Sequence, residues 1–257
     1  MNNTLTLLAR RRSTRAYLPT PLTVDEKDAI LHAAFRAPTA GNSMLYTIIE
    51  VEDQALKDRL AVTCDHQPFI AEAPYVLLFL ADYQRWFDYY TLSGAQERCA
   101  ELGIPYREPS ASDLLLACCD ALIAAQNAVV AAESLGIGSC YIGDILENYE
   151  IHRDLFHLPR YALPVTLLCF GRPARAPEGD SRVPRFAPEF IAHRNAYHHL
   201  DAAELERMFA PLQARTPASQ YVAGAENLGQ HQYLRKFAAA FSVEMSRSVR
   251  EMLKNWE

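Results

Sequence analysis

The chain has 257 residues, of which 50% are hydrophobic and 22% charged, and its formal net charge is -6 at pH 7. This composition supports one sizeable core or two smaller ones and excludes a largely disordered chain. The acidic balance disfavours a nucleic-acid partner. Because no uninterrupted apolar run reaches about 18 residues, we also expect no membrane span.

The N-terminal third alternates helices and strands. Residues 4–12 predict a short amphipathic helix, and a second helix starts at the capping box of Thr23 and Glu26 and ends before Pro38. Residues 46–52 are predicted as a strand, 54–62 as a helix, and 74–82 as an apolar strand buried on both faces.

The middle of the chain contains the longest predicted helix. An aromatic-rich helix over 83–103 is followed by an apolar helix that Ser112 caps and Gly136 ends. Because this second helix is apolar nearly all round, we expect it in the centre of the core. Strands separated by helices predict a layered α+β or α/β domain. The later predicted elements are strands over 139–145 and 163–171, a proline-rich loop over 173–188, and helices over 201–209 and 232–256.

Two arginine-rich segments lie far apart in the sequence. The stretch ARRRSTRAY, residues 9–17, offers Arg11, Arg12, Ser13 and Arg15 at the end of a predicted helix. Guanidinium groups and a hydroxyl suit a phosphate, although for this segment alone a solvated basic turn at a helix C-terminus is the better explanation. The loop after the last strand adds a second group that could converge on the same anion: Arg172, Arg175, Arg182 and Arg185.

Two further segments suit a flat ligand. The stretch APTAGNSMLY, residues 37–46, leaves a helix for a strand and carries small and amide side chains, although an ordinary loop has the same composition. The stretch GIGSCYIGDI, residues 136–145, lacks the G-x-G-x-x-G spacing and precedes a strand, which excludes a dinucleotide fingerprint. Its glycines would instead let the backbone approach a planar ring.

The cysteines and histidines predict no metal site. Six cysteines include no C-x-x-C pair, and the eight histidines include no H-E-x-x-H pattern. Thiols packed as small hydrophobic side chains are typical of a reducing compartment, so we expect a cytoplasmic protein.

The four segments, with the C-terminal helices, resemble the nitroreductase family of FMN-dependent NAD(P)H oxidoreductases, in particular its larger oxygen-insensitive, flavin-reductase-like branch. The resemblance implies an α+β fold of three layers, with a central, mostly antiparallel sheet flanked by helices and a C-terminal helical excursion. It further implies an FMN-binding core over 1–200 and a helical extension over 201–257 that packs on the partner subunit.

The same resemblance assigns cofactor-binding residues. It implies a phosphate site at the N-terminal turn, a contact from Arg15 that stabilises the reduced flavin, a segment supplied by the second subunit, a glutamine at the ring, and backbone beside the ring. Asp144 departs from the glycine that relatives often have, and the spacing of the late arginine pair departs by one residue. The expected set is Arg11, Arg12, Ser13, Arg15, Pro38, Thr39, Ala40, Asn42, Met44, Gln67, Tyr141, Ile142, Gly143, Arg182 and Arg185.

The implied function is reduction of nitroaromatics, quinones or flavins by NAD(P)H, with NADPH favoured, through a ping-pong two-electron mechanism. FMN would carry the chemistry in a homodimer with FMN at the subunit interface, so no catalytic side chain is expected, and the acceptor would be a small aromatic or a quinone. The alternatives are another reaction on the same flavin scaffold, such as reductive dehalogenation, heterocycle oxidation or flavin breakdown, and a flavin-binding protein without turnover.

Overall fold

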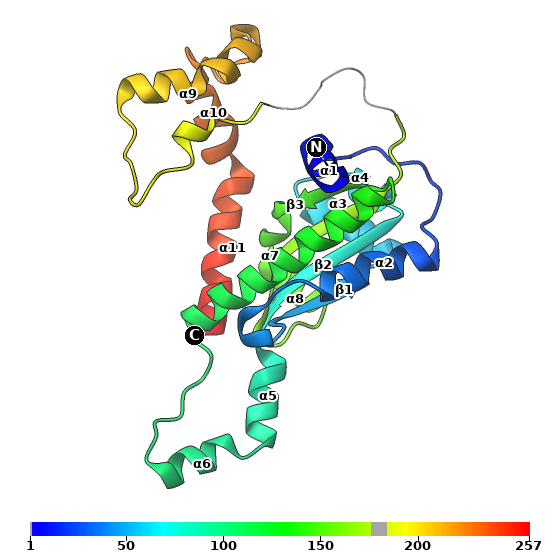
Figure 1. Ribbon diagram of the computed structural model, residues 1–257, viewed down its shortest axis with the longest axis vertical. Helices are drawn as coiled ribbons and strands as arrows, with labels where there is room; N and C mark the ends of the chain where they lie inside the picture. The colour runs from blue at the N-terminus through cyan, green and yellow to red at the C-terminus, as the bar shows by residue number, and fades with distance from the viewer. Residues whose placement is uncertain (1, 176–183) are drawn as a thin grey trace. The chain divides into compact units, whose positions relative to one another are not determined.

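The fold is α+β, as expected, and the described residues form one four-stranded sheet, which is antiparallel throughout. The computed structural model describes residues 2–175 and 184–257. The strands β1 (Tyr46–Glu50), β2 (Tyr75–Asp82), β3 (Gly138–Ile142) and β4 (Ala162–Gly171) lie in the order β1-β2-β4-β3 (Figure 1). The chain divides into two compact units, residues 1–176 with 244–257, and residues 177–243, which are described separately.

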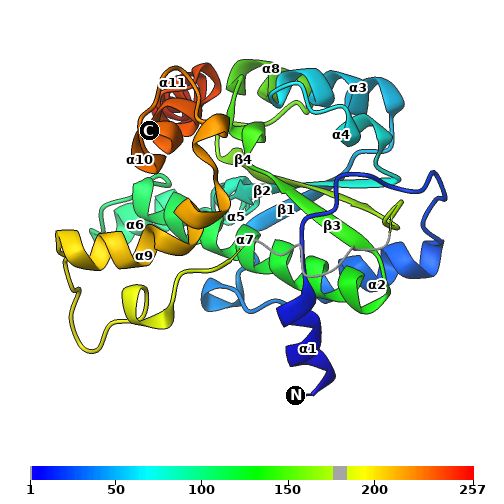
Figure 2. The ribbon, with the colours of Figure 1, turned by 90° about the horizontal axis from the view of Figure 1, so that it is seen from above.

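Helices cover both faces of the sheet in the first unit. On one face, α2 (Val24–Phe35) and α7 (Ala111–Ser134) pack against Leu77 and Phe79 of β2. On the other face, α3 (Gln54–Thr63) and α4 (Phe69–Glu72) pack against Val76 and Leu78 (Figure 2). Successive residues of a strand point to opposite faces, so both layers are needed to bury β2, which is buried at every residue.

A third cluster closes the end of the sheet where β2 finishes. It contains Tyr149 of α8 (Tyr149–Leu155), Tyr161 before β4, and Met252 and Trp256 of α11 (Ala240–Trp256). The indole Nε1 of Trp256 donates to the carbonyl of Ser110 at 3.1 Å. The last helical turns of α11 therefore belong to the core of the first unit.

Several helix boundaries differ from the sequence-based expectation. Ser110, not Ser112, caps α7, because Ser110 forms a capping box with Asp113. The expected single helix over 83–103 is two helices, α5 (Gln84–Leu92) and α6 (Ala95–Leu102), since Gly94 adopts φ 69° between them. The remaining helices are α1 (Asn3–Arg10), α9 (Ala202–Arg215) and α10 (Leu228–Gln232), the last followed by a π-helical turn over Tyr233–Phe237 that separates it from α11.

Helix α7 does not lie in the centre of the core, which corrects the expectation from its composition. One face is buried, whereas Leu115, Leu116, Leu122 and Ile123 on the other face are 68, 48, 46 and 40% exposed. Among the described residues, α7 is the one helix whose length and hydropathy would let it cross a membrane. Its buried face covers its own sheet, and the core helix of a water-soluble protein meets the same criterion.

Candidate functional site

The arginine-rich segment after α1 runs along the free edge of β3. Ser13 forms a parallel bridge with Ser139, and the amide of Thr14 donates to the Ser139 carbonyl at 2.9 Å. A Cβ atom at Gly138 would overlap the side chain of Thr14. Gly138 therefore permits the close approach that fixes residues 13 and 14 beside the strand.

The next residues continue across the end of β4. The amide of Leu18 donates to the Arg172 carbonyl at 2.8 Å, and the amide of Ala174 donates to the Ala16 carbonyl at 3.0 Å. The hydroxyl of Tyr17 donates to the Thr14 carbonyl at 2.6 Å, and burial raises the pKa of Tyr17 well above its usual value. Backbone hydrogen bonds thus hold both ends of the arginine-rich turn against the sheet.

Arg11 carries buried nitrogen atoms that the protein does not pair. Its Nε and Nη2 have no hydrogen-bond partner among the described residues, and its guanidinium lies 5.7 Å from the ring centroid of Tyr141. Burial raises the pKa of the nearby Glu133 carboxyl, although Arg11 and Arg12 lower it. Unpaired buried guanidinium nitrogens are rare, because each loses its hydration, so this position favours an anionic ligand.

Cys140 shows that Ser13 and Arg15 lie at the same edge. Burial raises the pKa of the Cys140 thiol, and Arg15, a hydrogen bond from Ser13, and Arg11 lower it. The buried hydroxyl of Ser139, on the neighbouring residue of β3, has no hydrogen-bond partner among the described residues. The edge of β3 therefore combines positive charge with unpaired polar atoms.

Gln67 lies between α3 and α4, in the helical layer opposite α7, and its side chain reaches the residues that follow β3. It follows Asp65 and His66, which adopt φ values of 56° and 52°, and its Nε2 donates to the Cys64 carbonyl at 2.9 Å. The same nitrogen donates to Asp144 Oδ2 at 2.7 Å. Asp144 directly follows Gly143, so the structure brings Gln67 together with the expected backbone segment over 141–143.

The segment over 38–44 lies elsewhere in the unit. It leads into Tyr46, which pairs with Ala81 near the far end of β2, whereas Ser139 pairs with Phe170 at the other end of the sheet. Because β1 and β3 are opposite edge strands, the two segments are separated by roughly 20 Å along the strands and roughly 14 Å across them. Within one chain, five of the expected residues are therefore far from the β3 edge. They are Pro38, Thr39, Ala40, Asn42 and Met44.

Asp120 of α7 fixes the shape of that segment. Its Oδ1 accepts from the Ala40 amide at 2.9 Å and its Oδ2 accepts from the Leu45 amide at 3.0 Å. Between them, Gly41, Asn42 and Met44 adopt left-handed conformations with φ of 56°, 57° and 50°. The two hydrogen bonds to this buried carboxylate offset the backbone strain of the turn. The residues Asn42 and Met44 of the turn are exposed.

The described structure does not test the expected contacts of Arg182 and Arg185. Arg182 lies outside the described residues. Arg185 belongs to the second unit, where it is exposed. Arg172 forms an ion pair with Glu26 at 2.5 Å. The expected roles of Arg182 and Arg185 stay predictions.

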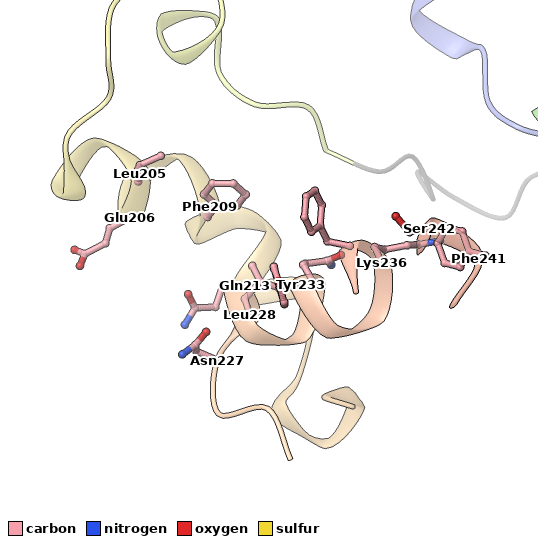
Figure 3. A pocket seen from close by; sticks show the side chains of 13 residues that line it. Leu205, Glu206, Phe209, Gln213, Asn227, Leu228, Tyr233, Lys236, Phe241 and Ser242 are labelled. Carbon is pink, nitrogen blue, oxygen red and sulfur yellow. The ribbon is translucent and has the colours of Figure 1, made fainter. Parts of the chain in front are cut away.

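A cavity of about 960 Å³ lies within the second unit, between α9 and the segment from α10 to the start of α11 (Figure 3). Its lining includes Leu205 and Phe209 of α9 together with Tyr233, Phe237 and Phe241. None of the expected cofactor-binding residues lines this cavity.

Sequence reasoning did not identify Ser139 or Asp120. A signal for Asp120 exists, because it is a single carboxyl in the apolar stretch over 114–125, and a buried acid requires partners. Ser139 had no such signal, since its importance follows from the bridge to Ser13.

An antiparallel sheet between two helical layers, with an arginine-rich segment along one edge strand, defines a three-layered α+β protein. A family model described as the nitroreductase family matches residues 8–172. The chain belongs to the nitroreductase family.

The most informative relatives are bacterial. The oxygen-insensitive NADPH nitroreductase of Salmonella typhimurium is 34% identical over 209 residues, which cover 80% of each chain. The FMN reductase (NADPH) of Bacillus subtilis is 30% identical over 200 residues, covering 77% of this chain and 76% of the relative. The solved structure of B. megaterium NfrA2 superposes with a TM-score of 0.82 at 27% identity, covering 100% of this chain and 98% of that one. The expected cofactors, FMN with NAD(P)H as electron donor, agree with the names of these relatives.

Proposed function

We propose that this chain is an FMN-dependent oxidoreductase that uses NAD(P)H, preferably NADPH, to reduce nitroaromatics, quinones or flavins. The observation that carries the proposal is Arg11, whose buried Nε and Nη2 have no partner among the described residues. Supporting it are the names of two relatives, an NADPH nitroreductase and an FMN reductase.

The residues at the β3 edge fit the chemical groups of FMN. Arg11, Arg12 and Ser13 offer guanidinium and hydroxyl donors for the phosphate, which is a dianion with several acceptor oxygens. Arg15 would stabilise negative charge on the reduced ring, and Tyr141, Ile142 and Gly143 would lie beside it. Bound there, FMN supplies the redox chemistry by accepting a hydride from NAD(P)H and passing electrons to the acceptor.

The separation of the expected segments supports a homodimer. In one chain, the segment over 38–44 and the β3 edge lie at opposite edges and opposite ends of the sheet. A second copy would supply 38–44 to a cofactor at the subunit interface. The exposed apolar face of α7, with Leu115 at 68% exposure, is a surface that such a partner would cover. The extension over 201–257, whose last turns at Met252 and Trp256 join the core of their own chain, would also pack on that partner.

Two substrates that use the same ring face must alternate, so we propose ping-pong kinetics without a catalytic side chain. The acceptor would be a small aromatic or a quinone. The free thiols of Cys64, Cys140 and Cys169, all buried, support a reducing cytoplasmic location.

The visible spectrum of the purified protein tests this function. We expect a yellow protein whose flavin absorbance disappears on anaerobic addition of NADPH and returns when a quinone or a nitroaromatic compound is added. A flavin that neither NADPH nor NADH reduces would instead support a flavin-binding protein without turnover. A colourless protein that does not bind added FMN would overturn the proposal.

The contribution of Arg11 can be measured separately with apoprotein. We expect Arg11→Ala to weaken FMN binding about 10- to 100-fold, as loss of a charge-assisted hydrogen bond does. Riboflavin, which lacks the phosphate, should bind both proteins equally in a fluorescence-quenching titration. Arg10→Ala is the matched control, because Arg10 is exposed in the last turn of α1. Equal losses for FMN and riboflavin would show that Arg11 does not bind the phosphate.

A further inference from the structure

The amide of Gln67 has only one possible orientation. Its Nε2 lies 2.9 Å from the Cys64 carbonyl and 2.7 Å from Asp144 Oδ2. A backbone carbonyl only accepts hydrogen bonds, and so does a carboxylate. An amide oxygen in this place would face two acceptors, so the NH2 group must lie there.

Both amide hydrogens of Gln67 are consequently used within the protein. The remaining polar atom, Oε1, accepts no hydrogen bond from the described residues and can only act as an acceptor. Gln67 is partly exposed, two residues before α4, and its backbone is anchored by a hydrogen bond from its amide to the Ala61 carbonyl at 2.7 Å. The side chain therefore offers an acceptor, and no donor, to a ligand.

A second carboxyl group lies close to Asp144 in the chain. The amide of Glu147 donates to the Asp144 carbonyl at 3.0 Å, and the Oε1 of its side chain is buried without a hydrogen-bond partner among the described residues. Glu147 is 5% exposed, and burial, followed by the charges of Asp144, Asp65 and Glu244, raises its pKa to about 7.

We propose that Asp144 is a positioning residue that turns Gln67 Oε1 toward the cofactor, so that it accepts a hydrogen bond from N3–H of the flavin. This rests on the proposed function, in which Gln67 contacts the ring. Oxidised isoalloxazine has a single N–H donor, at N3, and its other polar ring atoms are acceptors. Since Gln67 has only an acceptor to offer, N3–H is the one polar group of the oxidised ring that it can pair with.

The experiment compares FMN with 3-methyl-FMN, in which a methyl group replaces the N3 hydrogen. Apoprotein is titrated with each flavin, and quenching of flavin fluorescence gives the two dissociation constants. We expect the wild type to bind FMN about 10-fold more tightly than 3-methyl-FMN, the preference that one hydrogen bond of ordinary strength gives. Gln67→Ala should reduce the preference to the steric effect of the methyl group, about 2-fold.

Two substitutions of Asp144 separate amide orientation from charge. Asp144→Ala removes the carboxylate that orients the Gln67 amide, so the preference of this variant for FMN over 3-methyl-FMN should fall toward that of Gln67→Ala. The double variant should show no further loss of this preference. Asp144→Asn keeps an oxygen that accepts from Gln67 Nε2, and should keep the preference of the wild type within about 2-fold. Circular dichroism checks that each variant is folded, and Gln67→Ala tests the N3–H contact even if Asp144→Ala does not fold.

The outcomes are distinct. An equal preference in the wild type and Gln67→Ala would overturn the N3–H contact, and a preference lost equally in Asp144→Asn and Asp144→Ala would overturn the positioning role of Asp144. Either result leaves the oxidoreductase proposal intact if FMN still binds. Failure of the wild-type apoprotein to bind any FMN would instead contradict the proposed function itself.

Discussion

Buried polar groups are left unpaired at one edge of the sheet and are paired at the other edge. At the β3 edge, Arg11 and Ser139 have buried polar atoms that find no partner among the described residues. At the β1 edge, Asp120 binds the amides of Ala40 and Leu45, and the strained turn between them is held from within. Unpaired groups at the β3 edge support the FMN site proposed there, whereas the paired amides at the β1 edge hold an exposed, strained segment in one shape.

The largest effect on stability should come from a substitution of Asp120, which holds the turn at the β1 edge. Asp120→Ala leaves two backbone amides without their carboxylate, and we expect the free energy of unfolding to fall by about 2–4 kcal/mol. Urea denaturation of the apoprotein measures this loss. Asp88→Ala is the control, because Asp88 lies on exposed α5 and should change stability by less than about 0.5 kcal/mol. A loss at Asp120 no larger than the control would show that the turn does not depend on this carboxylate.

Two glycine substitutions at the β3 edge should have intermediate effects, one on the free energy of unfolding and the other on FMN affinity. Gly138→Ala pushes a methyl group into Thr14, so unfolding free energy should fall by about 1–3 kcal/mol. Gly143→Ala meets no atom within 4 Å, so stability should hold, but FMN affinity should fall several-fold if the backbone there lies against the ring. Thermal denaturation and FMN titration of both variants measure the two effects. The opposite pattern, with Gly143→Ala unstable and FMN binding unchanged, contradicts this assignment.

The smallest expected effect is the change in the free energy of unfolding with pH that comes from Glu147. Its pKa of about 7 in the folded protein lies above its ordinary value of 4.5, so the folded state holds an extra proton between these values. Stability from this group is therefore greatest below about pH 4.5 and decreases as pH rises to about 7. His152 acts in the opposite sense, since burial lowers its pKa from 6.5 to about 4, and its contribution is lost as pH falls through that window.

Glu147→Gln isolates the first of these contributions. The variant removes the titrating group, so its stability relative to the wild type should increase between pH 5 and pH 8, by about 1–2 kcal/mol. Urea denaturation at pH 5, 6.5 and 8 gives this difference, from which the contribution of His152 cancels. A difference that stays constant with pH would mean that Glu147 does not titrate in this range.

Local patterns predicted much of the fold. The apolar runs at residues 74–82 and 163–171 indicated β2 and β4, and the pair Thr23 and Glu26 indicated the capping box that begins α2. The order β1-β2-β4-β3 could not be read from the sequence, because it depends on pairings between strands that are far apart in the chain. The exposure of α7 was also not predictable, since an apolar surface has the same composition whether its own chain or another one covers it.

The site was predictable to the extent that its residues cluster in sequence. The stretch 11–15 and the backbone at 141–143 stand out in the sequence, and the structure places both at the β3 edge. The bond between Gln67 and Asp144 joins residues 77 positions apart, and that between Asp120 and Ala40 joins residues 80 apart. No local spacing indicates such pairs, because folding rather than sequence proximity brings them together.

If the apolar stripe on α7 is the dimer contact proposed above, the stability of this protein depends on its concentration. In the proposed homodimer, folding and association are coupled by mass action, so dilution would favour the separated, less stable chains. Unfolding midpoints of the apoprotein should accordingly rise with protein concentration. A polar residue at Leu115, which is 68% exposed, would weaken this dependence without touching the sheet.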